Sequence, residues 1–382
     1  MISLFGTWMQ STAQGYLVFD ITHSQAYLGY VGFASGAATW IFTLAGGALA
    51  DRASRRAVLV ATQSASLVLA FILSALTFTK TVTPWHIIVL AFCLGVVNAF
   101  DAPARQAFVL EMVDRKSLTN AIALNSTMFN MATAVGPAVG GLTYAFLGPG
   151  WCFLLNGASF LAVIGALLAM KLAPFSAQPH RPSLWRDISE GFRVVRSNRL
   201  IAALIVLIGL MSLFGMSFVT LIPAWAVNVL KGDATTNGYL QSARGVGALI
   251  AALGIATFVS RGGRGKMITA GMFFFPAMLL AFSFTRILSL SLVVLLFVGA
   301  GSITMMNVAN SLVQTLSPDS ARGRVMGIYT LFFFGFSPVG SLLAGAAAQR
   351  FGEPVTVMVS ALIMTACVSA ITLVVPALKR QE

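Results

Sequence analysis

The chain has 382 residues, of which 58% are hydrophobic and 9% are charged, and its formal net charge is +13. Soluble domains usually carry about 25% charged residues, so this composition excludes an ordinary soluble enzyme and indicates a protein that crosses a membrane many times. The basic residues stand in short segments between apolar stretches rather than on one face of a soluble domain, which argues against a nucleic-acid partner.

The side chains that usually carry chemistry are sparse. The three cysteines, Cys93, Cys152 and Cys367, all lie inside apolar stretches, and their spacing is typical neither of disulfides nor of a metal site. No phosphate-binding loop and no nucleophile–base pair stands out. We therefore expect no catalytic residues, no metal and no cofactor.

Twelve apolar stretches approach or exceed the ~20 residues that cross the hydrocarbon core of a bilayer. Helices are expected, because an open sheet edge is not stable in lipid. The sequence thus predicts an all-α membrane protein with twelve transmembrane helices. The first stretch starts at Met1 without a basic segment before it, so we expect that the start is truncated. The expected spans are 1–20, 27–50, 57–79, 84–101, 119–147, 150–172, 199–230, 236–259, 267–285, 287–312, 322–350 and 354–377.

The first span has a polar face. Gln10 and Gln14 recur with Ser3, Thr7 and Ser11 at three- and four-residue spacing, which places them on one side of a helix. Such a face is not expected to contact lipid. We expect it to line a wet cavity, and hydrogen bonding between helices is the alternative.

A dense cluster of charge follows the second span, where residues 46–56 read GGALADRASRR. The pattern resembles the loop motif G-x-x-x-D-R-x-G-R-R/K between the second and third helices of the major facilitator superfamily, although Ser54 replaces the usual Gly. The alternative is an ordinary basic loop of a polytopic protein. We expect Gly47 to let the helix end approach a neighbour, and we hypothesise that Asp51 gates access from the cytoplasm. The matching residues are Gly47, Asp51, Arg52, Arg55 and Arg56.

The distribution of Lys and Arg predicts the orientation. With residues 51–56 in the cytoplasm, cytoplasmic segments carry 19 basic residues and the opposite loops carry four. The positive-inside rule then predicts a plasma-membrane protein with both termini in the cytoplasm.

The fourth span carries Asn98 and reaches Asp101 at its cytoplasmic end, where Pro103 is expected to stop the helix. Arg105 stands close to Asp101 in sequence and favours its charged form. The loop that follows alternates apolar and charged residues, so it is expected to lie on the membrane surface as a short helix.

The centre of the fifth span reads NMATAVGPAVGGL. Ala132, Gly136 and Gly140 have the small-xxx-small spacing that lets two helices touch, and Pro137 bends the helix. With Gly141, this resembles the span-five motif G-x-x-x-G-P-x-x-G-G of superfamily exporters.

Nearly the whole chain resembles the enterobactin exporter-like branch, the transmembrane secretion effector family. The resemblance includes GTWMQSTAQGYLVFDIT at 6–22, DAPARQAFV at 101–109, NAIALNSTMFN at 120–130 and RGRVMGIY at 322–329. It implies the major facilitator fold and export of a small molecule. Thr133 stands where many relatives carry Arg, which puts any Arg-dependent mechanism of the fifth span in doubt.

The second half of the chain repeats the first. Residues 106–141 align with 310–345, which indicates two six-helix bundles related by an axis along the membrane normal. The segment between them has a helical apolar face and is expected to form an amphipathic helix at the membrane surface. The expected units are therefore 1–172, a linker at 173–198, and 199–382.

Energy coupling by protons requires a group that binds and releases a proton, and carboxylates near the membrane are few. Asp20, Asp101 and Arg244 are the candidates. We hypothesise that Asp20 at the outer end of the first span pairs with Arg244, a basic residue within the eighth span, when the outer side is closed. The alternatives are that Asp20 is solvated and that Arg244 snorkels to the surface.

The favoured function is proton-driven export of an amphiphilic small molecule, a drug or a siderophore-like metabolite, by a monomer in the bilayer. A nutrient importer and a transporter-like sensor that moves nothing are the alternatives. Polar, aromatic and Met side chains inside the spans are the candidates to line the substrate cavity. They are Gln10, Gln14, Asn98, Asn125, Asn130, Met211, Phe214, Asn307, Asn310 and Tyr329.

Overall fold

In the computed structural model, the described residues are 1–112, 117–170, 184–258, 264–319 and 321–374. The side chains of a few further residues, among them Asp51, lie outside this description. Every regular element of the described residues is a helix, as the composition predicts.

The first six helices follow one another through short connections, so neighbours in sequence run antiparallel. His23 takes a left-handed conformation and ends the first helix, and Gly148 with a φ of 93° separates the fifth from the sixth. Pro149 then begins the sixth, at a position where its missing N–H costs nothing. The helices are α1 (Ile2–Thr22), α2 (Gln25–Arg52), α3 (Arg55–Phe78), α4 (Pro84–Met112), α5 (Leu118–Leu147) and α6 (Pro149–Ala169).

The fourth helix does not stop where the sequence predicts. α4 runs through Pro103 to Met112, so the expected stop and the separate surface helix are both wrong up to that residue. The side chain of Arg105 contacts Asp101 one turn earlier, and this i,i+4 pair spans the proline and supports the continued helix.

The second half contains an amphipathic helix and one irregular segment. The segment 199–229 is long and apolar enough to cross a membrane, as the sequence predicts, and π-helical and 3₁₀ turns interrupt it before Pro223, whose ring removes a backbone donor. The elements are α7 (Leu184–Ser197), α8 (Arg199–Leu210), η1 (Met211–Gly215), η2 (Ser217–Leu221), α9 (Ile222–Ala224), η3 (Trp225–Val229), α10 (Ala234–Phe258), α11 (Arg264–Ser283), α12 (Leu288–Leu316), α13 (Arg322–Phe351) and α14 (Glu353–Val374).

Eight segments of the described residues are long and apolar enough to cross a membrane. They are α2, α3, most of α4, α6, residues 199–229, α12, α13 and α14. The long helices α1, α5 and α10 fall outside this group and contact one another. Their polar and small residues therefore face protein rather than lipid.

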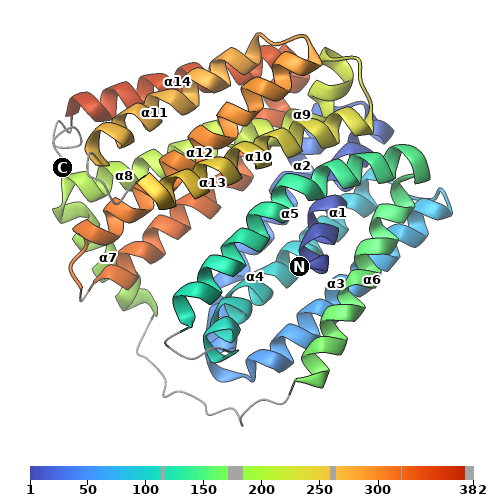
Figure 1. Ribbon diagram of the computed structural model, residues 1–382, viewed down its shortest axis with the longest axis horizontal. Helices are drawn as coiled ribbons and strands as arrows, with labels where there is room; N and C mark the ends of the chain where they lie inside the picture. The colour runs from blue at the N-terminus through green and yellow to red at the C-terminus, as the bar shows by residue number, and fades with distance from the viewer. Residues whose placement is uncertain (113–116, 171–183, 259–263, 320, 375–382) are drawn as a thin grey trace.

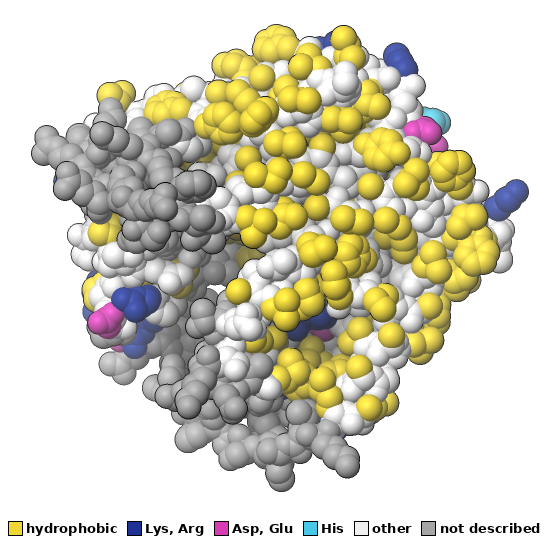
Figure 2. Space-filling model, viewed as in Figure 1, with side chains coloured by type: hydrophobic (Ala, Val, Ile, Leu, Met, Phe, Trp, Pro, Cys, Tyr) yellow, Lys and Arg dark blue, Asp and Glu magenta, His cyan; other side chains and the backbone are white. Residues whose placement is uncertain are grey.

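Figure 1 shows α1–α6 on one side of the molecule and α8–α14 on the other. The helix contacts correspond between the two groups: α2 packs on α4 as α10 packs on α12, and α3 packs on α6 as α11 packs on α14. Between the groups, α2 contacts α13 and α5 contacts α10. Hydrophobic side chains cover most of the face in Figure 2, as expected for a surface in contact with lipid.

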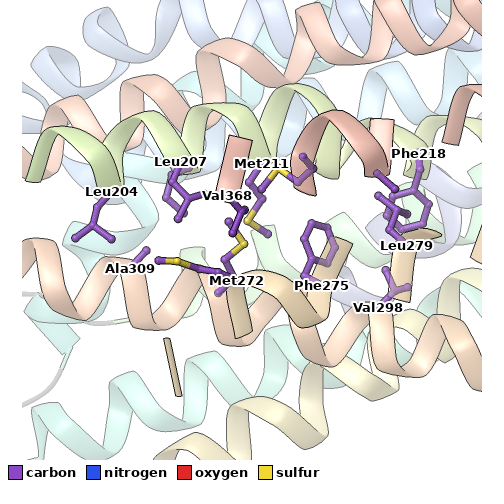
Figure 3. Close-up of a cluster of buried hydrophobic side chains, with 14 of the residues drawn as sticks. Leu204, Leu207, Met211, Phe218, Met272, Phe275, Leu279, Val298, Ala309 and Val368 are labelled. Carbon is purple, nitrogen blue, oxygen red and sulfur yellow. The ribbon is translucent and has the colours of Figure 1, made fainter. Parts of the chain in front are cut away.

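The largest apolar core belongs to the second group of helices. Leu207 and Met211 lie opposite Met272 and Phe275 in this cluster (Figure 3). The apolar cluster around Met9, mostly from the first group, is smaller.

Candidate functional site

The two groups of helices touch closely at one end of the molecule. A Cβ added at Gly29 of α2 would lie 2.9 Å from the Ser341 carbonyl oxygen of α13, and one at Gly141 of α5 would lie 2.5 Å from the Ala234 carbonyl oxygen of α10. Side chains add bonds across the same end: Ser24 Oγ donates to Gln349 Oε1 at 2.7 Å, with further bonds to Glu353.

A cavity of about 690 Å³ lies between the two groups, a size typical of small-molecule sites. It begins beside this closed end, at Thr220 and Ser341, and extends along α4 to Arg105 and Gln106, toward the end that carries the α2–α3 loop. At that end four consecutive residues of α5, 123–126, are all exposed, so no other helix covers any face of this turn. The cavity is closed at one end only.

The polar face of α1 lies on this cavity. Gln10 and Gln14 line it, together with Asn98 of α4 and Asn125 of α5, as their types and positions indicate. Gln10 Oε1 accepts a hydrogen bond of 2.7 Å from Asn156 Nδ2 of α6. Both expectations for this face therefore meet at Gln10, which lines the cavity and also bonds to another helix.

A buried carboxylate organises the cavity wall formed by α3 and α4. Asp101 is 7% exposed, and its Oδ1 accepts from Thr62 Oγ1 and Gln63 Nε2, each at 2.8 Å. Its Oδ2 accepts from Arg105 Nε at 3.0 Å and Nη2 at 2.6 Å. Charge and hydrogen-bonding capacity are thus satisfied within the protein. Gln63 itself lines the cavity with its Oε1 unpaired.

Several predicted cavity residues lie elsewhere. Met211 is buried in the apolar core, and Tyr329 Oη donates to the Met306 carbonyl oxygen at 3.1 Å. Asn310 Oδ1 accepts from Gln314 Nε2 on its own helix. These side chains therefore lie outside the described lining of this cavity, because residue type does not tell which face of a buried helix meets it, and their role in a substrate site stays a prediction. The predicted residues that do not line it are Asn130, Met211, Phe214, Asn307, Asn310 and Tyr329.

The residues of the second group of helices that line the cavity were not predicted from the sequence. Ser337 and Ser341 lie one turn apart on α13, and Thr220 Oγ1 donates to Ser341 Oγ at 3.0 Å. Gln241 of α10 also lines the cavity. The i,i+4 spacing of Ser337 and Ser341 is the same signal that marked α1, and it was available in the sequence.

Comparison with known proteins accounts for this architecture. The chain matches the transmembrane secretion effector family over residues 1–382. It belongs to this family of major facilitator transporters. The chain is accordingly a multi-pass membrane transporter for a small molecule, and not an enzyme.

The relatives of this transporter are named as transporters, efflux pumps or exporters. It is 27% identical to the staphyloferrin A transporter of Staphylococcus aureus, over 91% of this chain and 87% of that protein. It is 28% identical to the multidrug efflux pump Tap of Mycolicibacterium fortuitum, over 85% and 81%. It is 26% identical to the enterobactin exporter EntS of Escherichia coli O1:K1 / APEC, over 85% and 77%.

Solved structures of low sequence identity share the fold. The nucleoside transporter NupG superposes with a TM-score of 0.74 at 14% identity, over 100% of this chain and 98% of that chain. A bacterial homolog of the human lysosomal transporter Spinster, inward-facing and unoccupied, superposes with a TM-score of 0.70 at 13% identity, over 99% and 94%.

The glycine motif of the transporter's fifth helix lies in two contacts. A Cβ at Gly136 would lie 2.6 Å from Trp8 Cβ, and one at Gly140 would lie 2.9 Å from the Met9 carbonyl oxygen, so both residues pack on α1. Gly141 points the other way, to α10, and the Pro137 carbonyl oxygen lies against Gly238 of the same helix. The motif therefore serves contacts within the first group of helices and between the two groups.

The loop motif differs in one detail from its expected geometry. No atom lies within 4 Å of a Cβ added at Gly47, whereas one at Gly46 would collide with the backbone of Ala99 on α4. The close approach therefore belongs to Gly46. Arg56 donates to the carbonyl oxygens of Leu168 and Met170, which end α6.

The rest of the loop motif is placed only in part. Arg52 ends α2 and Arg55 begins α3, and the Asp51 side chain lies outside the described residues. The positive N-terminal end of the eleventh span, near residues 320–324, is the expected partner of the Asp51 carboxylate, and Ser320 in that segment also lies outside the described residues.

The hypothesised pair of Asp20 and Arg244 is not formed. Asp20 is exposed and accepts a hydrogen bond of 3.1 Å from Tyr144, one turn beyond Gly141, which contacts Ala234. Arg244 lies ten residues after Ala234, or ~15 Å along α10. The two side chains therefore lie at different depths although the end that carries the Gly29 and Gly141 contacts is closed.

Proposed function

We propose that this transporter is a secondary active exporter that works by alternating access. The observation that supports this most directly is a polar cavity between two groups of helices that is closed at one end only. Movement of one group against the other would open the Gly29 and Gly141 contacts and close the opposite end. The names of the relatives, which include a multidrug pump and an enterobactin exporter, favour export of an amphiphilic drug or siderophore-like metabolite.

We assign the groups to two six-helix bundles, 1–172 and 199–382, joined by the linker 173–198, with twelve membrane spans. The excess of basic residues places the α2–α3 loop and both termini in the cytoplasm. The cavity then opens to the cytoplasm, which is the side from which an exporter collects its substrate.

Protons are the proposed coupling ion, and Asp101 is the proposed site. It is the only carboxylate among the lining residues that the structure describes. Proton binding would remove the charge that holds Arg105 and would free Gln63 and Thr62, which gives the two protonation states different contacts. Asp20, exposed at the outer end of α1, has no such connection to the cavity.

The loop motif is proposed to gate the cytoplasmic end. It joins α2 to α3, and α2 contacts α13 across the two groups of helices. Asp51→Asn is expected to slow transport and leave substrate affinity and expression near wild type, with Ser54→Gly as a control that restores the usual motif. Wild-type turnover in Asp51→Asn would refute this role.

The proposed function is tested by flux in proteoliposomes with an acidified lumen. Ethidium, enterobactin and staphyloferrin A are offered outside, and accumulation is measured with and without an ionophore that abolishes the pH gradient. We expect uptake of at least one probe by transporters whose cytoplasmic side faces outward, loss of uptake with the ionophore, and loss in Asp101→Asn. Accumulation only under the opposite gradient would indicate import, and binding without any flux would indicate a sensor.

A further inference from the structure

The helix α10 presents three distinct faces. Gly238, Ser242 and Gly245 contact α5, and Ser242 Oγ accepts from the Ala138 N–H at 2.9 Å. Gly247 packs on the Leu296 backbone of α12. At 100° per residue, Gln241 lies between these two faces and lines the cavity. Arg244 lies at the border of the α12 face, with its carbonyl oxygen against Gly299, and it is one turn from Gln241 but not among the described residues that line the cavity.

Arg244 is buried without an internal partner. Its residue exposure is 9%, its Nε has no hydrogen-bond partner, and no ion pair to it is formed within the described ranges. Asn237, two turns away on the same face, is fully buried, and its Nδ2 is also unpaired. Its Oδ1 accepts from Gln241 Nε2 at 3.2 Å. This side of α10 therefore holds two unpaired donors, ~10 Å apart, on either side of a cavity residue.

Among the described residues that line the cavity, no carboxylate is available to neutralise this guanidinium. Asp101, the only one of them, already accepts four hydrogen bonds from Thr62, Gln63 and Arg105. An uncompensated charge inside a membrane protein is costly, and it is retained mainly where it meets a ligand or an ion. With the pair of Asp101 and Arg105 neutral, Arg244 adds an uncompensated positive charge one turn from the cavity residue Gln241.

We propose that Arg244 binds a carboxylate or similar oxyanion group of the transported molecule, with Gln241 and Asn237 donating to acceptors further along it. The planar guanidinium matches the two oxygens of a carboxylate. That the bound anion is the transported molecule rests on the proposed function. The site favours an anionic metabolite over a cationic drug as substrate, because the unpaired positive charge repels a cation.

The test measures binding rather than flux, so that it is independent of transport. Purified protein in neutral detergent is heated in sodium acetate, sodium citrate or sodium chloride at equal ionic strength. We expect acetate or citrate to raise the unfolding midpoint of the wild type by roughly 2–4 °C more than that of Arg244→Gln. The variant corrects for general stabilisation by these salts. Arg350→Gln, which removes an exposed arginine, should respond as the wild type does, and Arg244→Lys should keep part of the response.

Two further measurements make the result decisive. In chloride alone, Arg244→Gln should unfold at a midpoint equal to or above that of the wild type, because an unpaired buried charge is removed. A lower midpoint with equal salt responses would show a structural role and overturn the proposal.

Nanodiscs with or without phosphatidylglycerol separate the sources of the anion. Stabilisation by this lipid alone, lost in Arg244→Gln, would assign the site to a headgroup and overturn the assignment to cargo. An Arg244-dependent response to soluble anions, without flux of any probe, would retain the anion site and contradict the exporter function instead.

Discussion

The two sides of the cavity hold charge in opposite ways. On the α3–α4 side, Asp101 and Arg105 form an ion pair, and Thr62 and Gln63 complete the shell of the carboxylate. On the α10 side, Arg244 has no partner within the described residues. A paired charge stabilises one arrangement of helices whether or not a ligand is present. An unpaired one leaves free energy to be recovered when an anion arrives.

The apolar residues follow the same division. The second group of helices has a large core around Met211, Met272 and Phe275, and it contributes few polar residues to the cavity. The first group has polar side chains along α1, α3 and α4. We infer that the first group supplies most of the uncharged hydrogen bonds to a substrate, and the second supplies the charge.

The largest expected effect concerns the contact that joins the two sides. Gly141→Val places methyl groups where the backbone of Ala234 lies, and such overpacking destabilises the closed contact by about 1–3 kcal/mol. If closure of this end is part of the cycle, efflux should fall about tenfold or more. Gly165→Val on α6 is the matched control, because no atom lies within 4 Å of a Cβ there. Normal efflux by Gly141→Val would show that the contact is dispensable.

The second prediction removes the paired carboxylate. Asp101→Ala leaves the buried Gln63 amide without its acceptor and Arg105 without its ion-pair partner, and it should lower the free energy of unfolding by about 2–3 kcal/mol, measured by SDS titration in mixed micelles. Asp101→Asn keeps an acceptor oxygen and should lose less. The control is Asp319→Asn, which breaks a surface pair and should have no measurable effect. Equal stability of Asp101→Ala and wild type would show that the paired carboxylate does not stabilise the protein, and would contradict the contrast between the two sides of the cavity.

A smaller effect is expected from the other member of the pair. The Arg105 side chain is 39% exposed, so water screens its charge, and Arg105→Gln should lower the free energy of unfolding by only about 1 kcal/mol. Arg244→Gln should leave it unchanged or raise it in the same SDS titration. Opposite signs for the two substitutions would sharpen the contrast between the sides, and equal losses would contradict it.

The smallest effect is a predicted absence of coupling. Asp20 and Arg244 lie at different depths, so a double-mutant cycle of Asp20→Asn and Arg244→Gln should show an interaction of no more than about 0.5 kcal/mol. The cycle is measured by the same SDS titration. A larger coupling would indicate that the two side chains meet in a conformation other than the one described here.

The sequence by itself determined the membrane class, the helical fold, the family and the polar face of α1. These follow from local regularities: the length of apolar stretches, the spacing of Gln10 and Gln14, and the motifs of residues 46–56 and 132–141. The small residues Gly136 and Gly140 were expected in close helix contacts for the same reason, and they lie against α1.

Only the tertiary structure decided which residues meet across the cavity. Sequence does not report depth or rotation of a helix, so Gly46 rather than Gly47 lies against α4, and Met211 and Tyr329 lie away from the cavity, which Thr220 and Ser341 line instead. Charge partners depend on the same two quantities. Asp101 and Arg105 pair because they are one turn apart on one helix. A partner for Arg244 would have to come from another helix, and the way the helices align brings none to it within the described residues.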